Sequence, residues 1–156
     1  MTFRTLIEEL NDRLNVEIED AGGAFALEID GQTVVLQLAG GPNGDILLAR
    51  ADIGEVPPDR REALAAAAME ANFLYQGTGG ATLALNPVNG HLHLHRYDWL
   101  DRLDADKALE TFSRFADTVS AWRRIVADVR PTARDVPAHA AASSAADLPP
   151  SGMMPV

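Results

Sequence analysis

The sequence contains no cysteine among its 156 residues. Disulfides and thiolate metal sites are therefore excluded, and the absence fits a reducing compartment such as the cytoplasm. Basic residues are also scarce, since 13 Lys and Arg stand against 23 Asp and Glu and give a formal net charge of −10. This charge opposes approach to phosphate backbones and anionic lipids, which disfavours nucleic acid and membrane surfaces as partners.

Long apolar runs are missing too. No stretch approaches the roughly 20 residues that cross a bilayer, and residues 1–5 lead into a charged helical pattern rather than an apolar leader. We therefore expect a soluble, unsecreted chain without membrane insertion.

The usual reaction centres are also absent. Ser113 and Ser120 fall within a predicted helix, and the other serines lie near the C-terminus, so none has the setting of a nucleophile elbow. The glycine-rich stretches 40–44 and 77–80 lack the lysine of a phosphate loop and are typical of turns. We predict a binding protein with no catalytic residues and no cofactor.

The composition changes near residue 130. Residues 131–156 hold five of the nine prolines and an alanine- and serine-rich run, with few large apolar side chains. Such a segment cannot bury enough surface to offset its ordering entropy. We predict one α+β domain over residues 1–130 and a Pro/Ala-rich disordered tail over 131–156.

Hydrophobic periodicity predicts the elements of this domain. A period near 3.6 indicates helices over residues 3–14 and from about 104 onward, and alternation indicates strands over 25–29, 33–38, 46–51, 81–86 and 91–95. A further helix is predicted over residues 58–75, where two prolines and an acidic residue precede an alanine-rich apolar run. Turn signals join neighbouring strands. We therefore expect an α-β-β-β-α-β-β-α order, with a mainly antiparallel five-stranded sheet carrying three helices on one face.

The second of these helices is apolar on nearly every side between residues 63 and 74. A small domain can hardly cover such a helix alone, so a second copy of the chain is the natural cover. We predict a homodimer with Met69, Phe73 and Leu74 in its interface. The alternative is a helix buried within the monomer, where its alanines allow close approach.

One pattern favours a different function. His91, His93 and His95 fall on the same side of the last predicted strand, and a His-x-His pair with a third histidine can hold zinc. Successive same-face residues sit about 6.5–7 Å apart, which spreads three imidazoles too far for one ion. We predict no metal site, and keep a small metal-dependent enzyme or metal sensor as an alternative.

The order of these patterns resembles the class I chaperones of bacterial type III secretion, the Tir chaperone (CesT) family. Six short core-and-turn segments carry the likeness across nearly all of residues 3–125. They are residues 3–14, 25–30, 53–57, 69–73, 80–86, and 112–115 together with 121–123.

The resemblance implies a homodimer in the bacterial cytoplasm that holds the N-terminal chaperone-binding segment of an effector protein in extended form, soluble and ready for export. It implies no catalysis and no nucleotide. The same resemblance makes the ATPase of the secretion apparatus a further candidate partner. A dimeric regulatory adaptor of the same fold is a second alternative.

The family's groove matches the first helix and first hairpin of this chain, and a sheet edge beside apolar pockets is a recurring way to capture an extended peptide. Side chains of this kind are more often core than groove. The candidate effector-binding residues are Leu6, Leu10, Phe25, Leu27, Val34 and Leu36.

Overall fold

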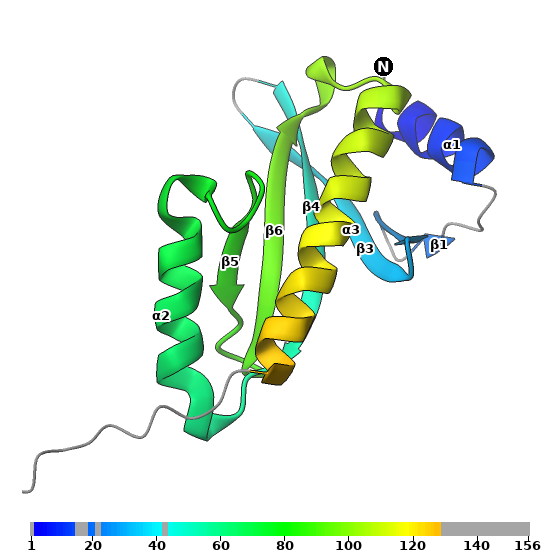
Figure 1. Cartoon of the computed structure of the whole chain (residues 1–156). Coiled ribbons are helices and arrows are strands. Elements are labelled where there is room, and N and C mark those ends of the chain that lie inside the picture. Colours follow the sequence, from blue (N-terminus) through cyan, green and yellow to red (C-terminus); the bar gives the residue numbers. More distant parts are fainter. Residues whose placement is uncertain (1, 15–18, 21–22, 42–43, 129–156) are drawn as a thin grey trace, which may run out of the picture.

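The computed structural model describes residues 2–14, 19–20, 23–41 and 44–128 (Figure 1). Three α-helices pack with one antiparallel sheet whose strand order is β1-β2-β3-β4-β6-β5. The helices are α1 (Phe3–Leu14), α2 (Arg61–Asn72) and α3 (Ala105–Asp128). The strands are β1 (Glu19–Asp20), β2 (Ala24–Ile29), β3 (Gln32–Gly41), β4 (Gly44–Glu55), β5 (Thr82–Leu85) and β6 (His91–Trp99).

The predicted α+β order is confirmed, with two differences. The two-residue edge strand β1 was not predicted, because so short a segment has no alternation to detect. The predicted helix over residues 58–75 is a 3₁₀ turn at Pro58–Arg60, then α2, then a second 3₁₀ turn at Phe73–Tyr75. A third 3₁₀ turn at Leu100–Arg102 leads from β6 toward α3.

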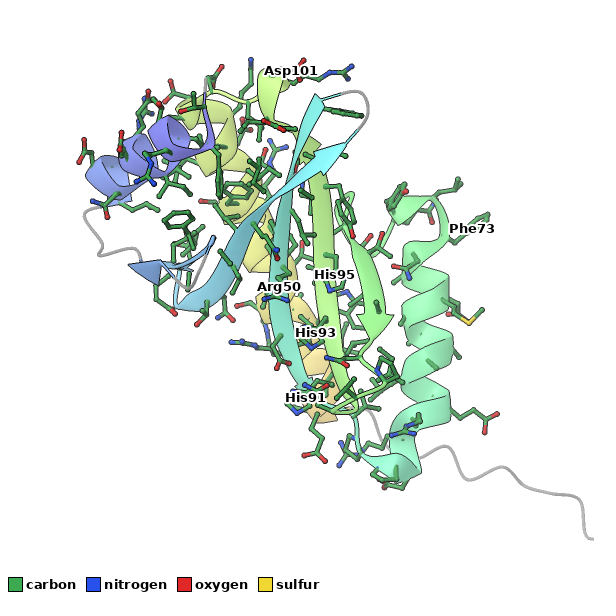
Figure 2. All side chains as sticks on the ribbon, turned by 180° about the vertical axis from the view of Figure 1, so that it is seen from behind. Arg50, Phe73, His91, His93, His95 and Asp101 are labelled. Carbon is green, nitrogen blue, oxygen red and sulfur yellow. The ribbon has the colours of Figure 1, made fainter. Side chains whose placement is uncertain are left out.

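Strand β6 shows how the two faces of the sheet differ. Leu92 and Leu94 are buried on the face that α3 covers, whereas His91, His93 and His95 lie on the opposite face (Figure 2). Because side chains alternate along a strand, the leucines join the core and the histidines stay near solvent. The predicted split of these residues between two faces is confirmed.

Helix α3 covers the centre of the sheet and contacts β2, β3 and β4 (Figure 1). Its apolar stripe is buried along the helix, and Phe112 and Val119 are fully covered. The Asp104 carboxylate accepts a hydrogen bond from the Lys107 backbone N–H at 2.9 Å, as expected of an N-cap. At the other end, the Arg60 guanidinium donates to the carbonyls of Val126 and Ala127.

Strand β3 serves two neighbours in turn. Residues 32–37 pair with β2 and residues 35–41 pair with β4, so β3 and β4 part beyond the pair Val35 and Arg50. The Arg123 guanidinium of α3 reaches into this split, where it donates to the Gln32 side chain and, at 2.9 Å, to the Asp52 carbonyl. The Arg123 side chain therefore bridges β3 and β4 where the backbone hydrogen bonds between the two strands end.

Helix α2 lies along β5 at the edge of the sheet (Figure 1). The Asn72 side chain accepts a hydrogen bond from the Leu83 N–H at 2.9 Å and donates to the Leu83 carbonyl at 3.1 Å. These are the backbone groups that an edge strand leaves unpaired. Asn72 thus covers the middle of the β5 edge.

The predicted domain boundary at residue 130 and the predicted tail over residues 131–156 lie outside the described residues. Within the described part of the chain, no helix combines the length and the apolar character needed to cross a membrane.

Core packing yields a first prediction. Leu36 has no exposed surface and lies on the face of β3 that α3 covers. Replacing Leu36 with alanine is expected to lower the free energy of unfolding by about 2–5 kcal/mol, because it leaves a cavity. Urea denaturation followed by circular dichroism measures the change.

The control is Val88→Ala in the β5–β6 turn, where the side chain is 92% exposed. This control is expected to change stability by less than about 0.5 kcal/mol. Equal stability of Leu36→Ala and wild type would contradict the placement of Leu36 in the core.

Candidate functional site

The clearest uncovered apolar surface lies at the end of α2. Within the chain, α2 buries only Leu64 and Ala68, whereas Met69 is 74% exposed, Phe73 68% and Leu74 69%. Tyr75 and Leu85 are exposed beside them. We call Met69, Phe73, Leu74, Tyr75 and Leu85 the α2 patch.

The α2 patch stands on an unusual stretch of backbone. Leu74 and Tyr75 have φ angles of 52° and 57°, in the left-handed region that large side chains rarely adopt. The following turn is held close to the domain, since the Trp122 indole donates to the Gly77 carbonyl at 2.9 Å. A Cβ at Gly77 would lie 2.6 Å from the Ala71 Cβ, so only glycine fits there. The fold thus holds Phe73 and Leu74 away from the core, and Phe73 points outward (Figure 2).

A pocket of about 180 Å³ opens between α2 and the sheet, next to the α2 patch. Its walls are mostly apolar and include Leu64, Met69, Leu83, Leu85 and Leu92. A dry cavity of about 150 Å³ lined by similar residues can hold a benzene ring. The pocket therefore has room for an aromatic side chain from outside the chain.

The six candidate effector-binding residues divide into two groups. Five of them, Leu6, Leu10, Leu27, Val34 and Leu36, are at most 2% exposed and form the core between α1, α3 and the sheet. Only Phe25 is half-buried, and its ring meets Phe3 edge to face with centroids 5.4 Å apart. A bound peptide could reach the other five only if the helices that cover them moved. Apolar spacing did not distinguish a groove from a core here, because both need the same pattern.

The uncovered face of the sheet carries the histidine row (Figure 2). His91 Nδ1 lies 2.8 Å from an Asp52 carboxylate oxygen, and the ring centroids of neighbouring histidines are 6.5 Å and 6.0 Å apart. Zinc–nitrogen bonds of about 2.0–2.1 Å require the ligating atoms to converge far more closely. No group of three or more potential metal ligands occurs in the part of the chain that the structure describes. The geometry offers the metal alternative no support.

Burial lowers the pKa of His95, and its neighbours His93 and Arg50 lower this pKa further. All three effects disfavour the imidazolium form. His93 adds an unusual feature, because its Nε2 atom is buried with no hydrogen-bond partner among the described residues.

Two functional features escaped sequence reasoning. The pair of hydrogen bonds from Asn72 to β5 depends on a contact between α2 and the sheet edge, and the Arg123 bridge depends on the split between β3 and β4. Both residues lie in segments that carry the family resemblance, 69–73 and 121–123, but the sequence pattern does not reveal which groups their side chains contact.

A comparison with protein-family models identifies one family. The model of the Tir chaperone protein (CesT) family matches residues 5–123. No curated protein matches the sequence.

Three solved structures resemble the chain, each at 18% sequence identity. The HopA1-SchA chaperone-effector complex has a TM-score of 0.60 and covers 78% of this chain and 93% of its own. The ExsC-ExsE complex has a TM-score of 0.58, with 85% and 99% covered. The ExoU-SpcU complex from the type III secretion system of Pseudomonas aeruginosa also has a TM-score of 0.58, with 80% and 98% covered. At this identity the likeness shows a shared fold.

The lowered pKa of His95 predicts a pH effect on stability. Below the ordinary value of 6.5, the unfolded chain takes up a proton at this histidine before the folded chain does, so the free energy of unfolding falls as the pH drops through that window. Replacing His95 with glutamine is expected to reduce the loss of stability between about pH 7.5 and about pH 5. Chemical denaturation at the two pH values measures it.

Thr82→Ala serves as the control, because Thr82 faces His95 across the β5–β6 pair and does not titrate. This variant is expected to keep the wild-type pH response. A His95→Gln protein that loses as much stability on acidification as the wild type would contradict the conclusion that the lowered pKa of His95 contributes to this loss.

Proposed function

Since the chain belongs to the Tir chaperone protein (CesT) family, we propose that it is a noncatalytic chaperone of type III secretion that binds the N-terminal segment of an effector protein. The observation that carries this proposal is the family match over residues 5–123, which takes in every element of the domain except the ends of α1 and α3. The chaperone-effector complex among the similar folds supports it. The proposal places the chain in the bacterial cytoplasm.

We propose further that the α2 patch is the self-association surface of a homodimer. Each large apolar side chain contributes about 1.5–3 kcal/mol when it is fully buried, and Met69, Phe73 and Leu74 remain largely in water in the single chain. The adjacent pocket supports a symmetric arrangement, because a two-fold contact brings the same surfaces together twice. Phe73 of one copy is then the natural occupant of the pocket of the other.

For the effector segment, the outer edge of β2 beside α1 is the proposed docking site. β1 pairs only with Ala26 and Phe25, so in the described residues β2 has no strand partner on that side from Leu27 to Ile29. An extended peptide would add main-chain hydrogen bonds at this edge. Phe25 and Phe3 supply apolar surface next to it. Direct contacts of the remaining candidates with a client, and binding to the secretion ATPase, stay predictions.

Dimerisation through the α2 patch is tested by Phe73→Glu. A charge in a buried apolar contact is strongly unfavourable, so the variant is expected to sediment as a monomer. The wild type is expected at twice the chain mass of 16.7 kDa by analytical ultracentrifugation.

Tyr97→Glu is the matched control, because Tyr97 is also largely exposed but lies on β6, outside the α2 patch. It is expected to stay dimeric. A monomeric wild type, or a dimeric Phe73→Glu protein, would remove the α2 patch from the proposal.

Effector binding is tested by co-expression with the proteins encoded beside this chain. An N-terminal fragment of about 50–100 residues is expected to copurify with two copies of the chain, since such a segment can bury on the order of 1,000–3,000 Å² when it orders on binding. Phe25→Ala is expected to reduce recovery of the fragment, and Val88→Ala is expected to leave it unchanged.

The function would be wrong if no neighbouring gene product copurified with the wild type. Copurification of a regulator in place of an exported protein would favour the adaptor alternative. Unchanged recovery with Phe25→Ala would move the docking site away from the β2 edge.

A further inference from the structure

The split between β3 and β4 forms a second pocket, separate from the one beside α2. Its volume is about 360 Å³, and it opens on the sheet face that carries the histidine row. The residues that matter for its chemistry are Thr33, Val35, Arg50, Asp52, His93 and Arg123. They come from β3, β4, β6 and α3, so the pocket exists only in the folded domain.

The charge of this pocket is opposite to that of the chain. Two guanidinium groups, Arg50 and Arg123, line it with one carboxylate, Asp52, although the whole sequence carries a formal charge of −10. The Asp52 carboxylate already accepts the Gly54 N–H at 2.9 Å and lies against His91. Glu28 is hydrogen-bonded to Thr33 and is not among the lining residues. The excess of one positive charge suits a monoanion better than a dianion.

Two donors in the pocket are poised for such a group. Arg50 is exposed, and its side chain makes no hydrogen bond or ion pair with any other described residue. Arg123 is held rigidly by its bonds to Gln32 and Asp52, so its orientation is set before anything binds. A planar carboxylate matches guanidinium groups in geometry and charge. His93 supplies a third polar group, because its buried Nε2 lacks a partner in the described chain.

We propose that this pocket binds the carboxylate of an aspartate or glutamate side chain carried by an extended peptide. The peptide origin rests on the proposed function, in which the domain binds an extended client segment. Val35 and Ala51 give the pocket an apolar wall beside the charged groups, and the facing edges of β3 and β4 have no ladder between them there. An acidic side chain with apolar neighbours fits this combination.

The test uses the full-length protein and short blocked peptides as probes. Acetyl-Val-Glu-Val-amide is titrated in parallel with acetyl-Val-Gln-Val-amide, sodium acetate and inorganic phosphate, while the ring signals of His93 are followed by NMR. The glutamate peptide is expected to give a saturable shift and to bind about tenfold more tightly than the glutamine peptide, as loss of a charge-assisted hydrogen bond predicts.

The decisive variant is Arg50→Gln, which removes an exposed charge without removing a described hydrogen bond or ion pair. It is expected to weaken binding of the glutamate peptide about tenfold and to leave the melting temperature unchanged. Arg124→Gln is the matched control, because Arg124 is an exposed arginine on α3 that bonds only to the Ser120 carbonyl among described residues. It is expected to bind like the wild type.

Four results would overturn the proposal. The first is equal binding of the glutamate and glutamine peptides, and the second is acetate binding as tight as that of the glutamate peptide. The third is phosphate binding tighter than that of the glutamate peptide and of acetate. The fourth is no loss of affinity for the glutamate peptide in Arg50→Gln. The outcome is independent of the chaperone test. Peptide binding without any copurifying client would leave the pocket in place and remove the function. Copurification of a client together with any of the four results above would keep the function and remove the pocket.

Discussion

The structure depends on the packing of α3 against one face of the antiparallel sheet. Phe112 and Val119 on the helix and Leu36 and Leu94 on the strands are fully buried in one continuous core. A sheet covered on one side needs strict alternation, and β6 provides it with leucines inward and histidines outward. Because α3 occupies the centre of this face, α2 is left at the β5 edge, where it buries only Leu64 and Ala68.

This arrangement separates the surfaces that the chain can use. The proposed self-association surface is the apolar end of α2, the proposed docking site for a client is the β2 edge at the other side of the sheet, and the charged pocket lies between them on the open face. Each surface comes from a different consequence of the same packing. A segment bound at β2 therefore has a path across the open face that does not disturb the α2 patch.

Patterns in the sequence were enough to predict the helices, the five longer strands and the order of these elements along the chain. Alternation around His91–His95 also indicated which face of the strand lies toward solvent. It was not enough to separate groove from core, since Leu27 and Leu36 follow the same pattern in either role. The splitting of β3 between two partners, the Asn72 edge contact and the Arg123 bridge depend on distances between elements far apart in the chain, and spacing along the sequence carries no such information.

The Asn72 contact with β5 bears on edge-to-edge aggregation. An open strand edge invites a second sheet to continue the ladder, which is the first step toward fibrils. By occupying the Leu83 amide and carbonyl, one side-chain amide closes the centre of that template. This contact therefore disfavours a second copy of the chain that would extend the sheet at β5, and it leaves the proposed contact through α2 as the alternative on this side.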